Sequence, residues 1–198
     1  MTLIELVMFI IVVGIGLAGI LSTLTFSVRY SADPMNRKQM LSIAEALLEE
    51  VELQPFTYCD PTDTAWATAT ATAACGTAQG LGPGVGLGQV RISTTTPFNN
   101  VADYNGASGS AATTGLGDAT HAITDLNGVA GPPVGYWASI AIDNTAAADL
   151  GPAAGMITAD GSAAGMNVVR ITVTVFHGSD TLVLEGYRAR YWPNDLPW

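Results

Sequence analysis

The chain has 198 residues, a length that suits one globular domain together with one extended element. Charged residues make up only 12% of it and glycine contributes 22 residues, an unusual composition for a soluble enzyme. Seventeen acidic and seven basic side chains give a formal net charge of −10. Because phosphate binding needs clustered Lys and Arg, this balance argues against a nucleic-acid partner and against a basic patch for anionic lipid.

The first predicted element is a long apolar helix. No charged residue occurs from Leu6 to Val28, a run of 23 residues. As a helix it would extend roughly 35 Å, enough to cross the hydrocarbon core of a bilayer. Arg29, Arg37 and Lys38 follow the run, so the positive-inside rule alone would place its C-terminal side in the cytoplasm.

Glu5 is an unexpected residue at the edge of this apolar run. An unpaired carboxylate drawn into hydrocarbon costs several kcal/mol, and a plain membrane anchor has no use for one. The natural partner is a cation at membrane depth, and the free α-amino group of residue 1 in a neighbouring chain would serve. This pairing predicts subunits stacked with an offset along their helices.

The opening string Met1-Thr2-Leu3-Ile4-Glu5-Leu6-Val7 resembles the mature N-terminus of type IV pilins and type II secretion pseudopilins. The resemblance implies that prepilin peptidase removes a basic leader and N-methylates Met1, and that Thr2 and Glu5 act in assembly. The leader's charges would keep the N-terminus cytoplasmic, which resolves the conflict with the basic residues after the run. An ordinary single-span anchor is the competing interpretation.

Three glycines, Gly14, Gly16 and Gly19, lie inside the apolar run. Each weakens a helix by about 1 kcal/mol relative to alanine. One explanation is close helix packing through small residues. The family resemblance suggests a second, which is local loss of helicity in the filament. Further on, Pro34 removes one backbone hydrogen bond and is expected to kink or restart the helix.

Residues 35–53 are predicted to continue as an amphipathic helix. One stripe of this helix is polar, and the opposite face is apolar and should cover a sheet. The polar stripe consists of Lys38, Ser42, Glu45, Glu49 and Glu52. The apolar face consists of Met40, Ile43, Ala44, Leu47, Leu48 and Val51. The acids Glu49, Glu50 and Glu52 close this helix, where the helix dipole disfavours negative charge. They form either a solvated acidic face or a set of partners for the basic residues of an adjacent subunit.

Cys59 and Cys75 flank a loop rich in Ala and Thr. Two cysteines placed in this way in an exported domain usually pair, and their spacing excludes a CxxC redox site. We therefore expect a disulfide.

Strand patterns follow at 89–93, 135–142, 168–176 and 181–190, the last two joined by a tight turn at 177–180. They predict an α+β fold in which the long N-terminal helix packs on an antiparallel sheet of about four strands. Long segments at 94–134 and 143–166 are expected to form loops at the filament exterior or against neighbouring subunits. The aromatic tail 191–198 is expected to dock on its own domain or on the next subunit. The predicted parts are 1–28, 29–54 and 55–198.

A closer resemblance is to the MshD-like pilins of mannose-sensitive haemagglutinin pilus systems. It rests on the stretches 31–61 and 184–188, which include Pro55-Phe56-Thr57-Tyr58-Cys59-Asp60-Pro61. It implies a filament subunit that passes from the inner membrane to the cell surface. Its partners would be other copies of itself, other pilins, prepilin peptidase and the pilus assembly machinery. The alternative is a membrane-anchored or tip-located minor pilin that acts as an adhesin or primes assembly.

No arrangement of residues in the sequence suggests an enzyme, and no cofactor is expected. His121 and His177 have no catalytic partner nearby in sequence. The segment 125–128 has two of the features of a calcium loop but lacks the remaining ligands. Calcium binding there, and O-linked sugar on the threonine-rich loop 62–72, are alternatives that the composition leaves open.

Overall fold

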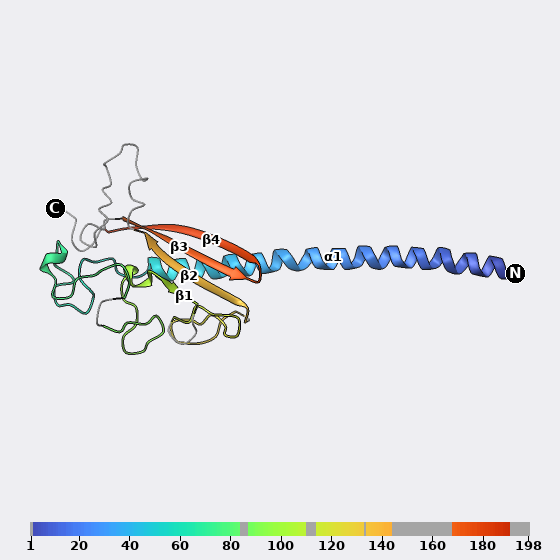
Figure 1. Cartoon of the computed structure of the whole chain (residues 1–198). Coiled ribbons are helices and arrows are strands. Elements are labelled where there is room, and N and C mark those ends of the chain that lie inside the picture. Colours follow the sequence, from blue (N-terminus) through green and yellow to red (C-terminus); the bar gives the residue numbers. More distant parts are fainter. Residues whose placement is uncertain (1, 84–86, 110–113, 133, 144–167, 191–198) are drawn as a thin grey trace, which may run out of the picture. The chain divides into compact units, whose positions relative to one another are not determined.

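The computed structural model describes residues 2–83, 87–109, 114–132, 134–143 and 168–190, with the backbone alone for 27–33. The chain forms two compact units, Met1–Gln39 and Met40–Trp198. Helix α1 (Leu3–Glu52) contributes to both (Figure 1). The described part of the second unit contains two short 3-10 helices, η1 (Thr72–Ala74) and η2 (Val101–Tyr104), and four strands. The aromatic tail and most of the loop at 143–166 lie outside the described residues.

The four strands form one antiparallel sheet in the order β1-β2-β3-β4, which confirms the predicted α+β class. Their bounds are Ala107–Ser108 for β1, Tyr136–Asp143 for β2, Val168–His177 for β3 and Asp180–Ala189 for β4. The two longest strands are joined by the predicted hairpin, whose loop residues are Gly178 and Ser179. Gly178 has a φ of +59°, which suits the first loop position of a two-residue hairpin turn.

The predicted strand Gln89–Ser93 is wrong. These residues form a turn, in which the Ser93 N–H donates to the Val90 carbonyl, and the Val90 N–H donates to the Thr96 carbonyl. Its alternation of polar and apolar residues has another cause, because the polar residues Gln89 and Arg91 are the buried ones. The fourth strand is instead β1, two residues long, which pairs with Ile140 and Ser139 of β2.

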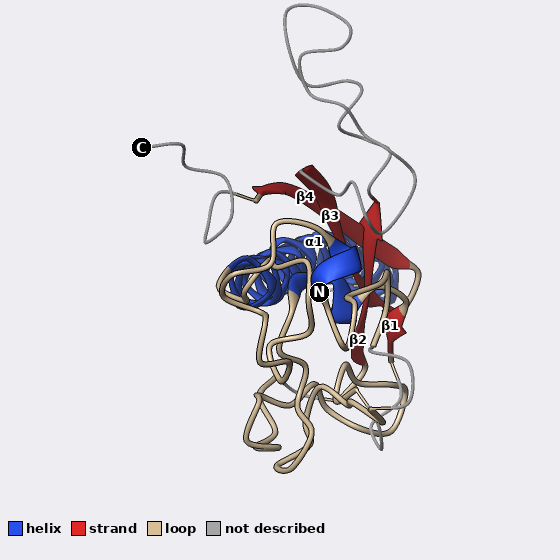
Figure 2. Cartoon of the chain, turned by 90° about the vertical axis from the view of Figure 1, so that its left-hand side faces the viewer, coloured by secondary structure: helices blue, strands red, loops and turns tan. Residues whose placement is uncertain are grey.

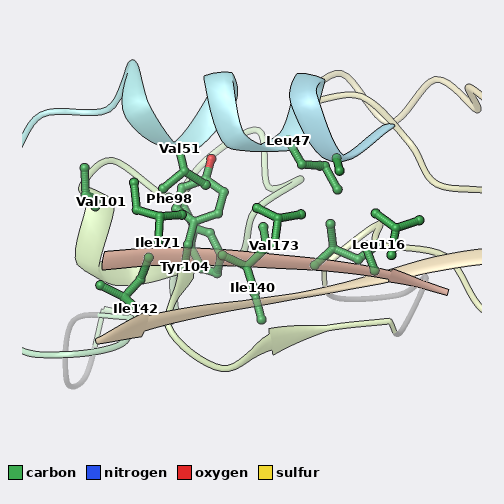
Figure 3. Close-up of a cluster of buried hydrophobic side chains, with 14 of the residues drawn as sticks. Leu47, Val51, Phe98, Val101, Tyr104, Leu116, Ile140, Ile142, Ile171 and Val173 are labelled. Atoms are coloured by element: carbon green, nitrogen blue, oxygen red, sulfur yellow. The ribbon is translucent and has the colours of Figure 1, made fainter. Parts of the chain in front are cut away.

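The core of the second unit lies between the C-terminal turns of α1 and one face of the sheet (Figure 3). Each strand contributes alternate residues, as the period of two requires. The buried residues are Met40, Ala44, Leu47 and Val51 of α1, Tyr136, Ala138, Ile140 and Ile142 of β2, and Val169, Ile171, Val173 and Val175 of β3. Ile43 and Leu48 pack against them in partly buried positions. The apolar face predicted for residues 35–53 is therefore the buried face.

The segment 94–134 contributes to this core and is not only a surface loop. Phe98, Val101, Tyr104, Leu116 and Ile123 are all buried in the same cluster. Figure 2 shows such irregular segments making up much of the second unit beside the strands. The length of this segment thus reflects a structural role inside the unit.

Gly186 of β4 lies close to side chains from the end of α1. A Cβ atom at this position would lie 2.5 Å from Glu52 Oε1 and 2.8 Å from Leu48 Cδ1. Real Cβ atoms do not approach other atoms so closely. Glycine at this position therefore makes room for the side-chain ends of Leu48 and Glu52, which would have to shift to admit a larger residue, while its φ is unremarkable.

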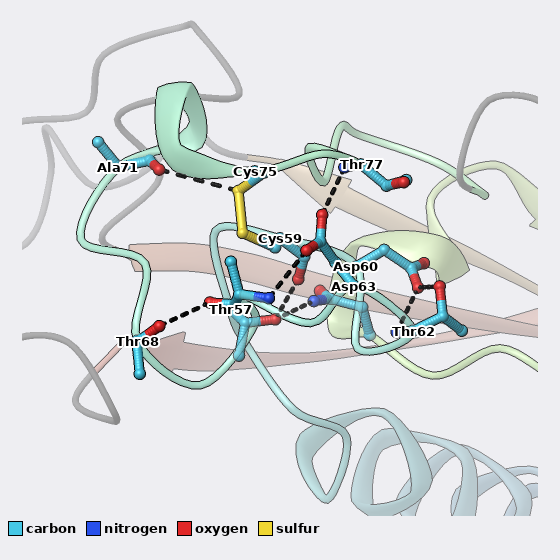
Figure 4. Close-up of a disulfide and its surroundings, with 11 residues drawn as sticks. Thr57, Cys59, Asp60, Thr62, Asp63, Thr68, Ala71, Cys75 and Thr77 are labelled. Carbon is cyan, nitrogen blue, oxygen red and sulfur yellow. Dashed lines mark hydrogen bonds between the residues drawn. A yellow bond between two sulfur atoms is a disulfide. The ribbon is translucent and has the colours of Figure 1, made fainter.

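The predicted disulfide between Cys59 and Cys75 is confirmed (Figure 4). It lies in a second, smaller cluster with Tyr58 and Ala69. Cys59 also forms an isolated antiparallel bridge with Ala78, so the two ends of the loop are held by backbone as well as by sulfur. The disulfide closes a loop that the small apolar cluster alone would hold weakly.

Candidate functional site

The most unusual surface of the molecule is the N-terminal part of α1. The segment Leu3–Phe26 has 24 residues, an 18-residue stretch within it has a mean hydropathy of 2.7, and none of the segment is buried. Leu3 is 83% exposed and Ile15 is 70% exposed. Each large apolar side chain left in water forgoes about 1.5–3 kcal/mol of burial free energy. The segment therefore requires an apolar environment from outside the chain and is long enough to be a membrane anchor or a signal segment.

Thr2 and Glu5 form the cap of this helix. The helix begins at Leu3, and the Glu5 N–H donates to the Thr2 carbonyl at 3.1 Å. The Glu5 carboxylate reaches back and accepts from the Thr2 N–H at 3.4 Å, the second half of a capping box. This local role was not predicted, although the Thr-x-x-Glu spacing is its signature. The bond is long and therefore weak, so a charged partner could replace it at little cost. Met1 lies outside the described residues.

The three glycines of the apolar segment make no close contact within the chain. A Cβ atom on Gly14, Gly16 or Gly19 would meet nothing within 4 Å among the described residues. The helix is unbroken at all three, and the hydroxyls of Thr23 and Thr25 donate to the carbonyls of Ile20 and Leu21. Loss of helicity in a filament, the predicted role of these glycines, is a property of the assembled state and stays a prediction.

Helix α1 passes through Pro34 instead of restarting there. Pro34 deprives one carbonyl of its helical N–H donor, but the bonds on either side suffice to keep the backbone helical. The proposed flexibility of this position stays a prediction. Beyond it, Arg37 and Lys38 are exposed, as are Glu45 and Glu49.

Glu50 has a partner inside its own chain, which corrects its assignment to a solvated face or to a neighbouring subunit. The Arg91 guanidinium binds it through two bonds, Nε to Oε1 at 2.7 Å and Nη2 to Oε2 at 2.6 Å. The side chain of Arg91 is 1% exposed and that of Glu50 is 14% exposed. This planar, two-bond pairing is the strong form of an Arg–carboxylate contact.

The pair has further hydrogen-bond partners in the loop region. Arg91 Nη1 donates to the carbonyls of Thr114 and Thr124 at 3.1 and 2.9 Å. The Tyr104 hydroxyl donates to Glu50 Oε1 at 2.8 Å. Burial and the adjacent Glu50 charge raise the pKa of Tyr104 well above its ordinary value. The pair therefore joins the end of α1 to three segments of the loop region.

Two sequence signals for this pair existed. Glu50 falls three residues after Leu47, at the edge of the apolar face and outside the polar stripe. Arg91 is the only charged residue between Asp63 and Asp103. A lone charge in an otherwise neutral segment is a candidate for burial, but its partner 41 residues away cannot be read from local pattern.

Two further acids are buried beside the disulfide loop. Asp60 accepts from the Thr62 N–H at 2.8 Å and from Gln89 Nε2 at 2.9 Å. Asp103 accepts from Gln79 Nε2 at 2.7 Å and from the N–H groups at positions 99 and 100 at 3.0 and 2.9 Å. Burial raises the pKa of the Asp103 carboxyl, although these hydrogen bonds oppose the shift. Both carboxylates organise the surrounding loops.

The histidines and the calcium-loop segment have local structural roles. His121 contacts Asp118 at 2.9 Å on the surface, and backbone and side-chain donors hold the pKa of Asp118 well below its usual range. His177 stacks on Tyr136 with 4.2 Å between ring centroids. Asp125 accepts from two N–H groups of its own turn. Within the described residues no three metal-ligating acids, histidines or cysteines gather.

In comparisons of the chain with protein-family models, curated proteins and solved structures, no match was found. The functional interpretation therefore depends on the residues and the geometry given above.

Proposed function

We propose that the chain is a structural subunit of a type IV pilus-like filament, held in the inner membrane by its N-terminal helix before assembly. The observation that carries this proposal is the fully exposed apolar segment Leu3–Phe26, which begins with Thr2 and Glu5. The second unit has its own core and disulfide, so it does not need this segment to bury its apolar side chains.

Two environments can receive the apolar segment. A bilayer does so for a single chain, and a bundle of parallel helices from many copies does so in a filament. A bilayer alone gives Glu5 no partner beyond the weak bond to Thr2. A bundle supplies a cation if the N-terminal amine of one copy lies beside Glu5 of the next, and this pairing would set the offset between subunits. Processing and N-methylation at Met1 belong to the same proposal.

The surroundings of the second unit agree with an exported location. A disulfide persists in oxidising compartments and is rare in the cytosol. The unit is also strongly acidic, which favours solubility on an exposed filament surface.

The decisive variant is Glu5→Ala, with Glu45→Ala as its matched control. Both remove one glutamate from α1, but Glu45 is an exposed residue of the second unit. We expect Glu5→Ala to remain in the membrane fraction and to be lost from sheared filaments, whereas Glu45→Ala enters both. Fractionation with immunoblotting, and electron microscopy of sheared material, provide the readout.

Normal filaments of Glu5→Ala would contradict the proposed role of Glu5 in register. In wild-type filaments, antibody labelling distinguishes a bulk subunit from a tip-located minor subunit. Labelling along the whole filament supports a bulk subunit, and labelling at one end supports the tip-located minor pilin with an adhesive or priming role. If the chain stays in the membrane and no filament contains it, the proposal is wrong.

A further inference from the structure

The two edges of the sheet in the second unit differ in their backbone hydrogen bonds. At one edge, beside the two-residue β1, irregular segments supply partners for β2. The outward backbone groups of Ala138, Ile140 and Ile142 are bonded there to Leu116, Gly109, Gly106 and Asn105. Strand β4 forms the opposite edge (Figure 1). The question is therefore what pairs with β4.

The strand pairing shows which backbone groups of β4 point away from the sheet. In an antiparallel sheet, the N–H and C=O of one residue point to one neighbouring strand, and those of the next residue point to the other. The Ile140 carbonyl points to the β1 edge, so Ser139 points to its β3 partner Thr174. The next residue of β3, Val173, then points to Leu184 of β4. Because the register is unbroken, the residues of β4 that point outward are Thr181, Val183, Glu185, Tyr187 and Ala189.

These outward residues leave the edge open. All five are exposed, with Val183 at 55% and Tyr187 at 45%. No backbone hydrogen bond from the rest of the described chain reaches their outward groups. Proteins commonly protect such an edge with a short strand, a bulge, proline or lysine. Strand β4 has ten residues in unbroken register and contains neither proline nor lysine. It is therefore a ready template for a further strand.

Glu185 determines what kind of strand fits this edge. It lies between Val183 and Tyr187 on the same face, and its side chain is 47% exposed. Its contact with Arg170 Nη1 is long at 3.9 Å, and Arg170 is bound more closely by Asp143, at 2.9 Å. Glu185 can therefore accept a cation from a residue directly opposite on an added strand, with apolar residues on either side.

A second copy of β4 fits this edge poorly. The antiparallel register that places Val183 opposite Tyr187 also places Glu185 opposite Glu185 of the other copy. Like charges directly opposite each other destabilise a strand pair. The net charge of −10 on each chain adds to the repulsion. The edge therefore favours a partner of different sequence and opposite charge.

We infer that the edge of β4 binds an extended segment of a partner protein in which a Lys or Arg lies between two apolar residues at alternate positions. Hydrogen bonds to the outward backbone groups provide the affinity of such strand addition, and the alternate side chains provide its specificity. This inference does not depend on the proposed filament.

The test uses the full chain in detergent micelles and the peptide acetyl-Thr-Val-Thr-Lys-Thr-Val-Thr-amide as the probe. Its two valines and its lysine would lie opposite Tyr187, Val183 and Glu185. The control peptide carries N-methyl groups on these same three peptide residues, which removes their backbone donors and keeps every side chain. At about ten times its Kd, the first peptide should slow hydrogen exchange of the Val183, Glu185 and Tyr187 amides about tenfold in ¹⁵N NMR spectra. The N-methylated peptide should leave the exchange unchanged.

Variants of β4 test the charge and the backbone separately. Glu185→Lys should weaken binding about fivefold because the attraction becomes a repulsion. Glu45→Lys makes the same change at an exposed residue of α1 and should bind as the wild type does. Val183→Pro removes an outward N–H that the sheet does not use, so the sheet should persist while binding weakens about fivefold.

The inference is overturned if the two peptides protect the amides equally, if neither protects them, or if both β4 variants bind normally. It is equally overturned if the outward amides are protected before any peptide is added. Another segment of the chain would then occupy the edge, or a second copy would do so if the protection grows with protein concentration.

Discussion

The two compact units of the chain handle their apolar side chains in opposite ways. In the first unit, Leu3–Phe26 is entirely exposed, and the chain itself offers it no partner among the described residues. In the second, the apolar face of α1 from Met40 to Val51 is buried against β2 and β3. The same helix thus changes from an element that needs other molecules to one that needs its own sheet.

Charge follows the same division. Three basic and two acidic side chains precede residue 40, whereas four basic and fifteen acidic side chains follow it. The first unit is therefore nearly neutral, and the second carries the acidity of the whole chain. In the second unit, contacts within the chain bury the apolar side chains. In the first unit, their burial depends on a membrane or on other subunits. The variants below test this division.

The largest expected effect is on the second unit. Arg91→Met would leave the Glu50 carboxylate in place without its cation, and breaking a buried pair in this way costs about 3–5 kcal/mol. We expect the free energy of unfolding to fall by this amount and the urea midpoint to move to a lower concentration. Urea unfolding monitored by near-ultraviolet circular dichroism measures both quantities. The control Glu49→Gln changes an exposed neighbour and should alter stability by less than about 0.5 kcal/mol. Equal stability of Arg91→Met and wild type would show that the pair contributes nothing to the unit.

A smaller effect is expected at the contact between α1 and β4. Gly186→Val would place atoms where Leu48 and Glu52 already lie, and overpacking of this kind costs about 1–3 kcal/mol. Ala189→Val changes an exposed residue of the same strand and serves as the control. Thermal unfolding of both variants measures the difference. If Gly186→Val melts like the control, the side chains of Leu48 and Glu52 make room for the added atoms without loss of stability.

The smallest expected effect per substituted residue in the single chain concerns the first unit. Replacing Gly14, Gly16 and Gly19 by alanine should strengthen the helix by about 1 kcal/mol per site, because no residue that the structure describes obstructs the added methyl groups. Far-ultraviolet circular dichroism in micelles should show helicity that is equal or higher. Filament yield should nevertheless fall if the glycines act between subunits or allow local unwinding. An unchanged filament yield would show that these glycines have no role in assembly.

Several features were determined by the sequence itself, since each depends on neighbours along the chain. The uncharged run from Leu6 to Val28 and the alternation of β3 and β4 both follow from local periodicity. The apolar face of α1 was predictable for the same reason. The Cys59–Cys75 pairing was predictable because the chain has only two cysteines and they flank one loop of a domain expected to be exported.

Tertiary structure decided the rest, because the partners are distant in sequence. Nothing near Arg91 indicates that its charge meets Glu50, and Gln89–Ser93 forms a turn that buries Arg91 instead of a strand. β1 has only two residues, too few for any periodicity, and exists because the edge of β2 offers it unpaired backbone groups. Asp60 and Asp103 are buried for a similar reason, since amide donors from separate loops converge on them. Local pattern fixes which elements form, and long-range hydrogen bonding and ion pairing fix what lies between them.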